Sequence, residues 1–94
     1  MAIKKSFQNA FDKASKTTYF EDFREDVGHR RYRNPFSGVW VELNPLESTI
    51  YNFCVEWYSR YESGETTEVP VSTYDNMRYY LLSLNSRAYM DLLD

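Results

Sequence analysis

The sequence predicts a helix-rich α+β fold that forms one compact domain over residues 1–94. Three observations lead to this class. Several stretches repeat apolar residues with the spacing of an amphipathic helix, one short stretch alternates as a strand does, and turn residues separate them. A chain of 94 residues is also the usual size of a single domain.

The first helix is predicted over residues 3–15. Its apolar face repeats at helical spacing and consists of Ile3, Phe7, Ala10, Phe11 and Ala14. Thr17 and Thr18 interrupt this pattern. A shorter helical pattern runs from Phe20 to Val27, and Gly28 is placed to end that helix.

The segment 29–38 has no periodic pattern and is predicted to be a loop, with turn dipeptides such as Asn34-Pro35. Residues 39–43 alternate along the chain and are rich in β-branched and aromatic side chains, which predicts a short strand. The candidate partner is an extended segment over 66–71, which Pro70 would restrict to the edge of a sheet.

Two long helices are predicted over residues 45–62 and 73–84. The first has three start signals, with Asn44 suited to the N-cap, Pro45 to the first helical position and Glu47 to the third. The second begins after a pattern that resembles a capping box, made by Ser72 and Asp75.

Asn85 and Ser86 are predicted to separate the second long helix from a short one that reaches Leu93. Together these patterns predict a core formed by Phe7, Phe11, Phe20, Phe23, Trp40, Leu46, Ile50, Phe53, Trp57, Met77, Leu81 and Leu84.

The composition favours contact surfaces over bond chemistry. Aromatic residues make up 18% of the chain, whereas histidine and cysteine occur once each, as His29 and Cys54. The sequence contains no glycine-rich phosphate loop, no nucleophile elbow and no paired metal-binding cysteines. We therefore expect a protein that is not an enzyme and that holds no cofactor.

Residues 19–29 contain side chains that could bind a metal ion, but the sequence lacks the further ligands that such a site needs. If residues 19–28 were helical, Asp22, Glu25, Asp26 and His29 would lie near one face. Helical metal centres need further carboxylates and a second histidine from facing helices, so we expect no metal. Cys54 lies on the apolar stripe of the first long helix and is expected to be buried and inert.

The cellular location is predicted from three features that are missing from the sequence. One cysteine cannot form an internal disulfide, and no stretch has the pattern of a signal peptide or of a membrane span. We therefore expect a cytoplasmic protein that has no membrane partner.

Charge is distributed unevenly along the chain. Residues 1–38 have eight Lys and Arg against five Asp and Glu, whereas residues 39–94 have three against nine. The basic half includes the cluster Arg30, Arg31, Tyr32 and Arg33, in which arginines can grip phosphates or carboxylates and the tyrosine can stack on a base. Three interpretations stay open, namely a nucleic acid, an acidic protein partner, or internal pairing with the four carboxylates of residues 21–26.

The tyrosines indicate a second candidate surface. Tyr58 and Tyr79 lie off the predicted buried faces of the two long helices, and Tyr61 ends the apolar stripe of the first. Clustered tyrosine and tryptophan are typical of interface cores, although part of this set is also expected to fill the core. The predicted interface residues are Tyr58, Tyr61 and Tyr79.

The function predicted from the sequence is that of a small, non-enzymatic accessory or adaptor protein. We expect it to bind a protein partner or a second copy of itself. The alternative is an accessory protein that binds nucleic acid through residues 29–33. An enzyme would need a pocket that holds His29 or paired carboxylates.

Overall fold

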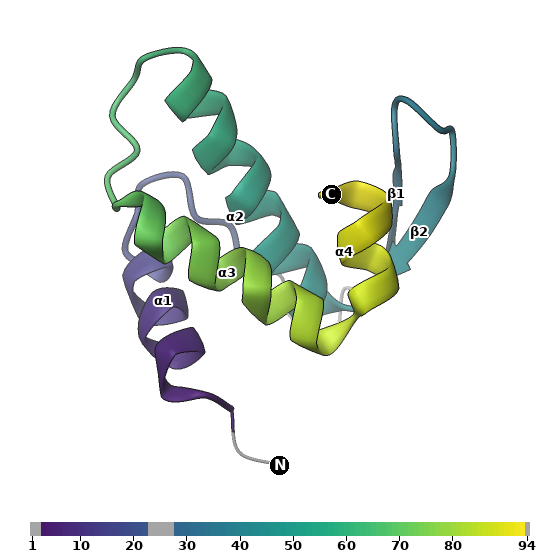
Figure 1. The fold of residues 1–94 in the computed structure, drawn as a ribbon, viewed down its shortest axis with the longest axis horizontal. Coiled ribbons are helices and arrows are strands. Elements are labelled where there is room, and N and C mark those ends of the chain that lie inside the picture. The colour runs from purple at the N-terminus through teal and green to yellow at the C-terminus, as the bar shows by residue number, and fades with distance from the viewer. Residues whose placement is uncertain (1–2, 23–27, 94) are drawn as a thin grey trace.

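The structure, a computed structural model, describes residues 3–22 and 28–93, and these confirm the helix-rich α+β class. Within them the elements follow in the order α1 (Lys5–Ser15), β1 (Arg30–Arg33), β2 (Trp40–Leu43), α2 (Pro45–Glu62), α3 (Val71–Leu84) and α4 (Ser86–Leu92). The three longer helices form the body of the molecule, while the strands and α4 form an arm beside it (Figure 1).

The core lies where α1 and α2 pack against α3. Each of these helices turns its apolar stripe inward, and the side chains that meet there are Phe7, Ala10, Ala14, Ile50, Phe53, Cys54, Trp57, Met77, Tyr80 and Leu81. Burying one large apolar side chain stabilises a fold by about 1.5–3 kcal/mol. The body of the domain is therefore held mainly by this single cluster.

Six residues of the predicted core are buried, namely Phe7, Ile50, Phe53, Trp57, Met77 and Leu81. Phe11 and Phe20 are half-buried and pack against the cluster. Phe23 lies outside the described residues. The prediction is wrong for three others, which are 57%, 39% and 42% exposed, namely Trp40, Leu46 and Leu84.

Each of these three errors has a local cause. Trp40 lies on the face of its strand that turns away from the helices, as the register described below shows. Leu46 is in the first turn of α2, where it borders a surface pocket. Leu84 is the last residue of α3, at the point where Asn85 leaves the helical conformation with φ −156°.

The start of α2 is confirmed in detail. The Asn44 side chain accepts a hydrogen bond from the Glu47 amide at 2.8 Å, and the Glu47 carboxylate accepts one from the Asn44 amide at 3.0 Å. Pro45 occupies the first position of the helix. This is a complete capping box, in which two backbone donors that have no partner inside the helix are satisfied.

Asn44→Ala is expected to lower the free energy of unfolding by about 1 kcal/mol, because the Glu47 amide loses the side-chain oxygen that accepts its hydrogen bond. Chemical denaturation followed by circular dichroism measures the effect. Asn44→Asp keeps the acceptor and should stay close to the wild type. Equal losses in both variants would contradict the capping role.

The predicted start of α3 is wrong. The helix begins at Val71, its N-cap is Pro70, and no side chain caps it. Asp75 does not reach back to Ser72 but receives the Arg78 guanidinium at 2.8 Å. An ion pair inside the helix has taken the carboxylate that the capping box would need.

The predicted first and last helices agree with the structure except at their ends. The N-terminal helix begins at Lys5 rather than at Ile3. The break before the last helix is confirmed, and Asn85 caps α4 by accepting from the Ala88 amide at 3.1 Å. A helix was also predicted over 20–27. Residues 20–22 of this segment are not helical, and residues 23–27 lie outside the described residues.

The sheet differs most from the prediction. Residues 30–33, expected in a loop, form β1, which pairs antiparallel with β2. The expected partner over 66–71 is not a strand, because side chains of the helical body bind its backbone. Trp57 donates its indole N–H to the Val69 carbonyl at 3.0 Å, and the Tyr19 hydroxyl donates to the Thr67 carbonyl.

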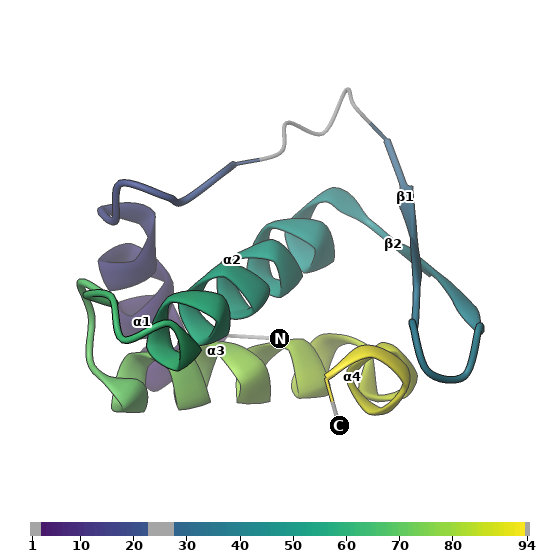
Figure 2. The same ribbon diagram turned by 90° about the horizontal axis from the view of Figure 1, so that it is seen from above.

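The hairpin and the far end of α2 lie at opposite ends of the molecule. Seen from above, β1 and β2 stand beside α4 at one end, and the loop that joins α2 to α3 is at the other (Figure 2). The molecule measures 35 × 30 × 23 Å along its principal axes. Among the described residues, no helix combines the length and the apolar content that crossing a bilayer requires.

Candidate protein-interaction surface

The two faces of the hairpin carry different side chains. In the antiparallel register, Tyr32 is opposite Val41, so both lie on the same face. This inner face packs on α2, since Asn52 donates a hydrogen bond to the Tyr32 hydroxyl at 2.8 Å and the ring of Tyr51 is 4.8 Å from that of Tyr32. Leu43 of the same face is fully buried.

The outer face displays two arginines and a tryptophan. Arg31 and Arg33 of β1 alternate with the inner residues, and Trp40 is opposite Arg33. The Arg31 guanidinium carbon is 5.1 Å from the centre of the Trp40 ring, which is a cation–π contact on a side chain that is 57% exposed. At the edge of this face, the His29 imidazole lies 3.2 Å from the Glu42 carboxylate.

The tip of the hairpin presents an exposed phenylalanine on an ordered turn. Phe36 is 97% exposed. Asn34 builds the turn, because its side-chain oxygen accepts from the amides of Phe36 at 2.7 Å and Ser37 at 3.1 Å. Its side-chain amide also donates to the Asp91 carbonyl in α4. The tip is therefore tied to α4, so Phe36 projects from a fixed turn.

The structure separates the members of the predicted basic cluster. Arg31 and Arg33 lie on the outer face, whereas Tyr32 turns inward and Arg30 is opposite buried Leu43. Within the described part of the chain, no carboxylate forms an ion pair with Arg31 or Arg33. Of the four upstream carboxylates proposed as internal partners, Glu21 and Asp22 are described and make no such pair, and the other two lie outside the described residues.

Two of the predicted interface tyrosines lie together near the end of α2, away from the hairpin. Tyr58 and Tyr61 lie 6.3 Å apart by ring centres and are 47% and 61% exposed. Beneath them, Trp57 stacks between Tyr61 at 5.3 Å and Tyr74 at 4.3 Å.

Tyr79 belongs to the same surface through an arginine. The Arg78 guanidinium carbon is 5.1 Å from the ring centre of Tyr74 and 5.5 Å from that of Tyr79. The same group also donates to the Tyr89 hydroxyl and to Asp75. Arg78 thus connects Tyr79, which is 47% exposed, to the stacked rings of α2.

Two tyrosines near this surface resist ionisation. Burial, with Glu68 as a further cause, raises the pKa of Tyr19 to about 12, and burial is also the main cause that raises the pKa of Tyr74 to about 12. The folded state therefore favours the neutral phenols of both side chains.

We expect stability to fall as pH rises from about 10 to about 12, and to be unaffected by these groups below that range. Unfolded tyrosine ionises near 10.0, so the unfolded state loses its protons first. Tyrosinate absorbance and denaturation at several pH values measure this. In Tyr74→Phe the fall should be shallower, and an equally steep fall in that variant would contradict the assignment.

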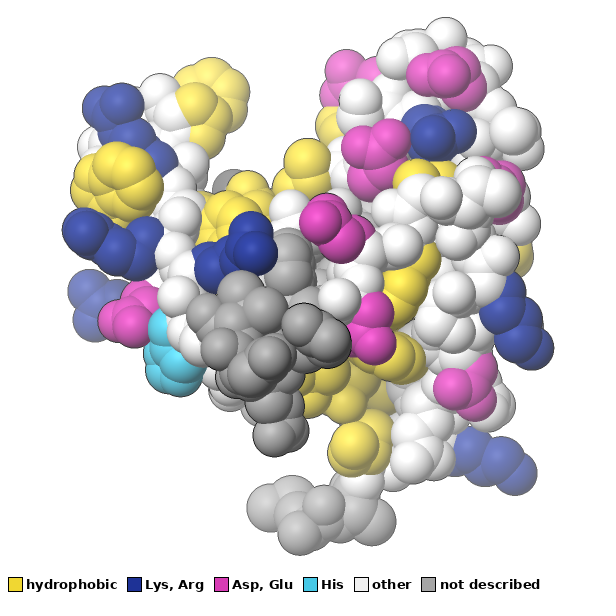
Figure 3. Space-filling view, turned by 180° about the vertical axis from the view of Figure 1, so that it is seen from behind, with side chains coloured by type: hydrophobic (Ala, Val, Ile, Leu, Met, Phe, Trp, Pro, Cys, Tyr) yellow, Lys and Arg dark blue, Asp and Glu magenta, His cyan; other side chains and the backbone are white. Residues whose placement is uncertain are grey.

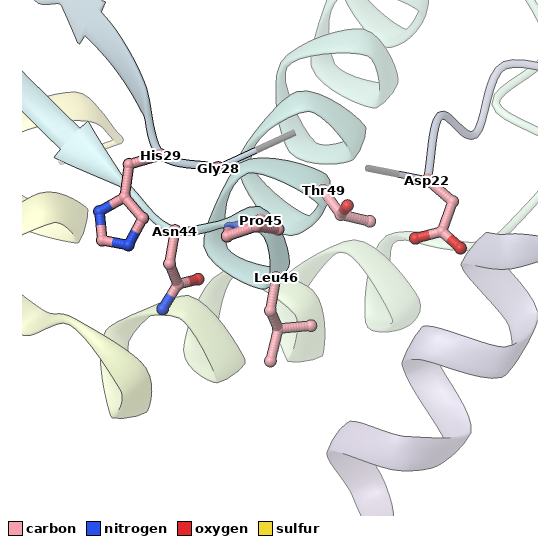
Figure 4. A pocket seen from close by; sticks show the side chains of 7 residues that line it. All are labelled: Asp22, Gly28, His29, Asn44, Pro45, Leu46 and Thr49. Carbon is pink, nitrogen blue, oxygen red and sulfur yellow. The ribbon is translucent and has the colours of Figure 1, made fainter. Parts of the chain in front are cut away.

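A pocket of about 560 Å³ lies between the hairpin and the start of α2. Asp22, His29 and Thr49 line it together with Gly28, Asn44, Pro45 and Leu46 (Figure 4). His29 and Asp22 lie on opposite sides of this pocket. The geometric condition set for an enzyme, a pocket that holds His29, is met, and the imidazole of this residue pairs with the Glu42 carboxylate.

The remaining reactive groups do not assemble into a centre in the described residues. Cys54 is fully buried in the core, and burial raises the pKa of its thiol, so it stays protonated at neutral pH. No three metal-binding side chains of the described part gather closely enough to hold an ion.

Comparisons with protein-family models, with characterised proteins and with solved structures found no match to this chain.

Sequence reasoning missed Phe36, Val39 and Trp40 as surface residues. A signal was present, since a turn at 34–38 is flanked by two stretches that alternate between faces. In the first stretch, arginine occupies positions on both faces, which hides the alternation. The structure shows that Arg31 and Arg33 mark the solvent side and Tyr32 the buried side.

Proposed function

We propose that this chain is a non-enzymatic accessory or adaptor protein that binds other protein surfaces through the outer face and tip of its hairpin. We call this the hairpin surface, and it consists of Arg31, Arg33, Phe36 and Trp40. The observation that carries the proposal is that two large aromatic side chains and two arginines are held outward on a hairpin whose turn is fixed to α4.

The chemistry of these four side chains supports a protein partner. Tryptophan and arginine are enriched at interface hot spots, where a few residues supply most of the binding energy. Leaving Phe36 97% exposed and Trp40 57% exposed in the free protein costs stability that a partner would recover by covering them.

A second contact area is offered by Tyr58, Tyr61 and Tyr79. A cytoplasmic location remains a prediction.

Affinity capture with the full chain tests the proposal. The wild type is compared with Phe36→Ser/Trp40→Ser, with Tyr58→Ser/Tyr61→Ser, and with Val71→Ser, a control at an apolar position that is 55% exposed elsewhere. We expect a stoichiometric protein partner that the hairpin variant loses and the control retains. Identical captured proteins from all four chains would contradict the proposal.

Nucleic acid binding is the second candidate, because an arginine stacked on an exposed tryptophan is also a platform for unpaired bases. It predicts binding that weakens steeply with salt. Anisotropy of labelled single- and double-stranded probes at two salt concentrations measures it. Arg31→Glu should abolish binding, and unchanged anisotropy at low salt would exclude this candidate.

A further inference from the structure

A second charged and aromatic surface lies at the opposite end of the molecule, and its chemistry complements that of the hairpin surface. We call it the acidic surface, and it consists of Tyr58, Tyr61, Glu62 and Glu65. Tyr61 stacks on buried Trp57, Tyr58 lies 6.3 Å from Tyr61 by ring centres, and both glutamates are exposed. Among the described residues, neither glutamate forms an ion pair.

The four residues of the acidic surface belong to the end of α2 and the loop that follows it. Tyr58 and Glu62 are one helical turn apart and interact, since the Glu62 carboxylate accepts from the Tyr58 hydroxyl and thereby raises the pKa of this tyrosine. The helix ends at Glu62, so Tyr61 and Glu65 come at its last turn and just beyond. The negative end of the helix dipole adds to the charge there.

Viewed from behind, Lys and Arg side chains gather on the hairpin arm, with apolar side chains between them (Figure 3). Asp and Glu side chains gather on the other arm, around the end of α2. An 18-residue helix is about 27 Å long, so the start of α2 beside the hairpin is far from its acidic end. The two surfaces of one molecule therefore cannot contact each other.

We propose that the hairpin surface of one molecule binds the acidic surface of a second copy, in a head-to-tail arrangement. This inference rests on the proposed function and names the partner. Each surface offers two aromatic rings and two like charges, with arginines on one and glutamates on the other. Glu42 shares the outer face of the hairpin with the arginines, and its carboxylate pairs with His29. Arginine binds carboxylates through paired hydrogen bonds, and the covered rings supply apolar contact.

A contact between two different surfaces has a consequence for assembly. The growing complex keeps an unused hairpin surface at one end and an unused acidic surface at the other, so association continues into a ring or an open chain. Because the arginine–glutamate pairs are exposed before contact, salt screens their attraction. Association should therefore increase with protein concentration and decrease with salt.

Light scattering after size-exclusion chromatography tests this with the full chain at several protein concentrations, in low and in high salt. The wild type should exceed its monomer mass of 11.3 kDa at high concentration in low salt and return toward it in high salt. Arg31→Glu/Arg33→Glu and Glu62→Lys/Glu65→Lys should each stay monomeric. Lys4→Glu/Lys5→Glu makes the same charge change as the first pair at the start of α1 and should associate like the wild type.

The decisive variant combines Arg31→Glu/Arg33→Glu with Glu62→Lys/Glu65→Lys. The hairpin surface is then negative and the other surface positive, so the charges across a head-to-tail contact are complementary again. We expect this fourfold variant to regain the concentration-dependent mass that each parent lost. Phe36→Ser, at a fully solvated position, supplies a second disruption that leaves all charges in place. Circular dichroism checks that each variant is folded.

Two results would overturn the proposal. One is a wild type that stays monomeric at every concentration and salt, and the other is a fourfold variant that associates no more than its parents. If the wild type is monomeric but captures a partner in a way that depends on Phe36 and Trp40, the self-association is contradicted and the proposed function is still supported. If the captured proteins do not depend on Phe36 and Trp40, both the self-association and the proposed function are contradicted.

Discussion

Phe53→Ala is expected to lower the free energy of unfolding by about 3–5 kcal/mol. Phe53 is 1% exposed at the centre of the core, and its ring stacks 5.8 Å from that of Tyr19. Truncation leaves a cavity between helices that are held in place by neighbours on every side, so collapse into the space is limited. A small domain has only about 5–15 kcal/mol of stability, so a large share of it is lost.

Val55→Ala is the matched control for this substitution. Val55 lies two residues further along α2 and is 44% exposed, so its truncation should change the unfolding free energy by less than about 0.5 kcal/mol. Urea denaturation of the three chains measures both effects. A Phe53→Ala protein within about 1 kcal/mol of the wild type would contradict the position of the core.

Asn34→Ala should release the tip of the hairpin. Three hydrogen bonds depend on this side chain, two from the turn amides of Phe36 and Ser37 and one to the Asp91 carbonyl of α4. At about 0.5–1.5 kcal/mol each, the loss of all three should destabilise the turn by about 1.5–4.5 kcal/mol. Amide hydrogen exchange should speed up at Phe36 and Ser37 and remain slow in the core.

Asn76→Ala is the matched control, because it removes the same type of side chain. Asn76 donates one hydrogen bond, to the Ser72 carbonyl one helical turn earlier at 3.1 Å. Its exchange pattern at the hairpin should match the wild type. If the proposed function is correct, Asn34→Ala also weakens partner capture, because Phe36 and Trp40 then lose their fixed geometry. Unchanged exchange at the hairpin tip in Asn34→Ala would contradict the anchoring role.

The helices could be predicted because their signals are local. The capping box at Asn44, the proline after it and the apolar stripe of α2 are all contained in one continuous segment. The same holds for the break at Asn85, where the side chain caps the next helix. Where two local interactions competed for one group, as for Asp75 between a cap and Arg78, the sequence did not show which would form.

The hairpin could not be predicted with the same success, because its pairing depends on contacts outside each strand. The sequence indicated residues 66–71 as the partner strand and 30–33 as part of a loop, whereas side chains from other segments bind the backbone of 66–71 and leave 30–33 to pair with β2. Which face of β2 is buried is decided by docking on α2, so Trp40 was assigned to the core and lies outside.

The candidate surfaces were partly visible in the sequence. The three arginines of the predicted cluster are exposed, and Tyr58, Tyr61 and Tyr79 are all about half exposed or more, whereas Tyr32 turns inward. What the sequence did not contain was their relation in space. Only the fold shows that Arg31 stacks on Trp40, and that the hairpin surface and the acidic surface lie at opposite ends.

Trp40 itself offers the most direct test that the hairpin surface is where this protein makes contacts. The chain has two tryptophans, and because Trp57 is 3% exposed in the core, a quencher in the solvent reaches Trp40. Acrylamide quenching of its emission is measured over a protein dilution series in low salt and with the captured partner. The account predicts that Trp40 becomes less accessible as the complex forms. Equal quenching in every condition in which a complex is present would contradict it.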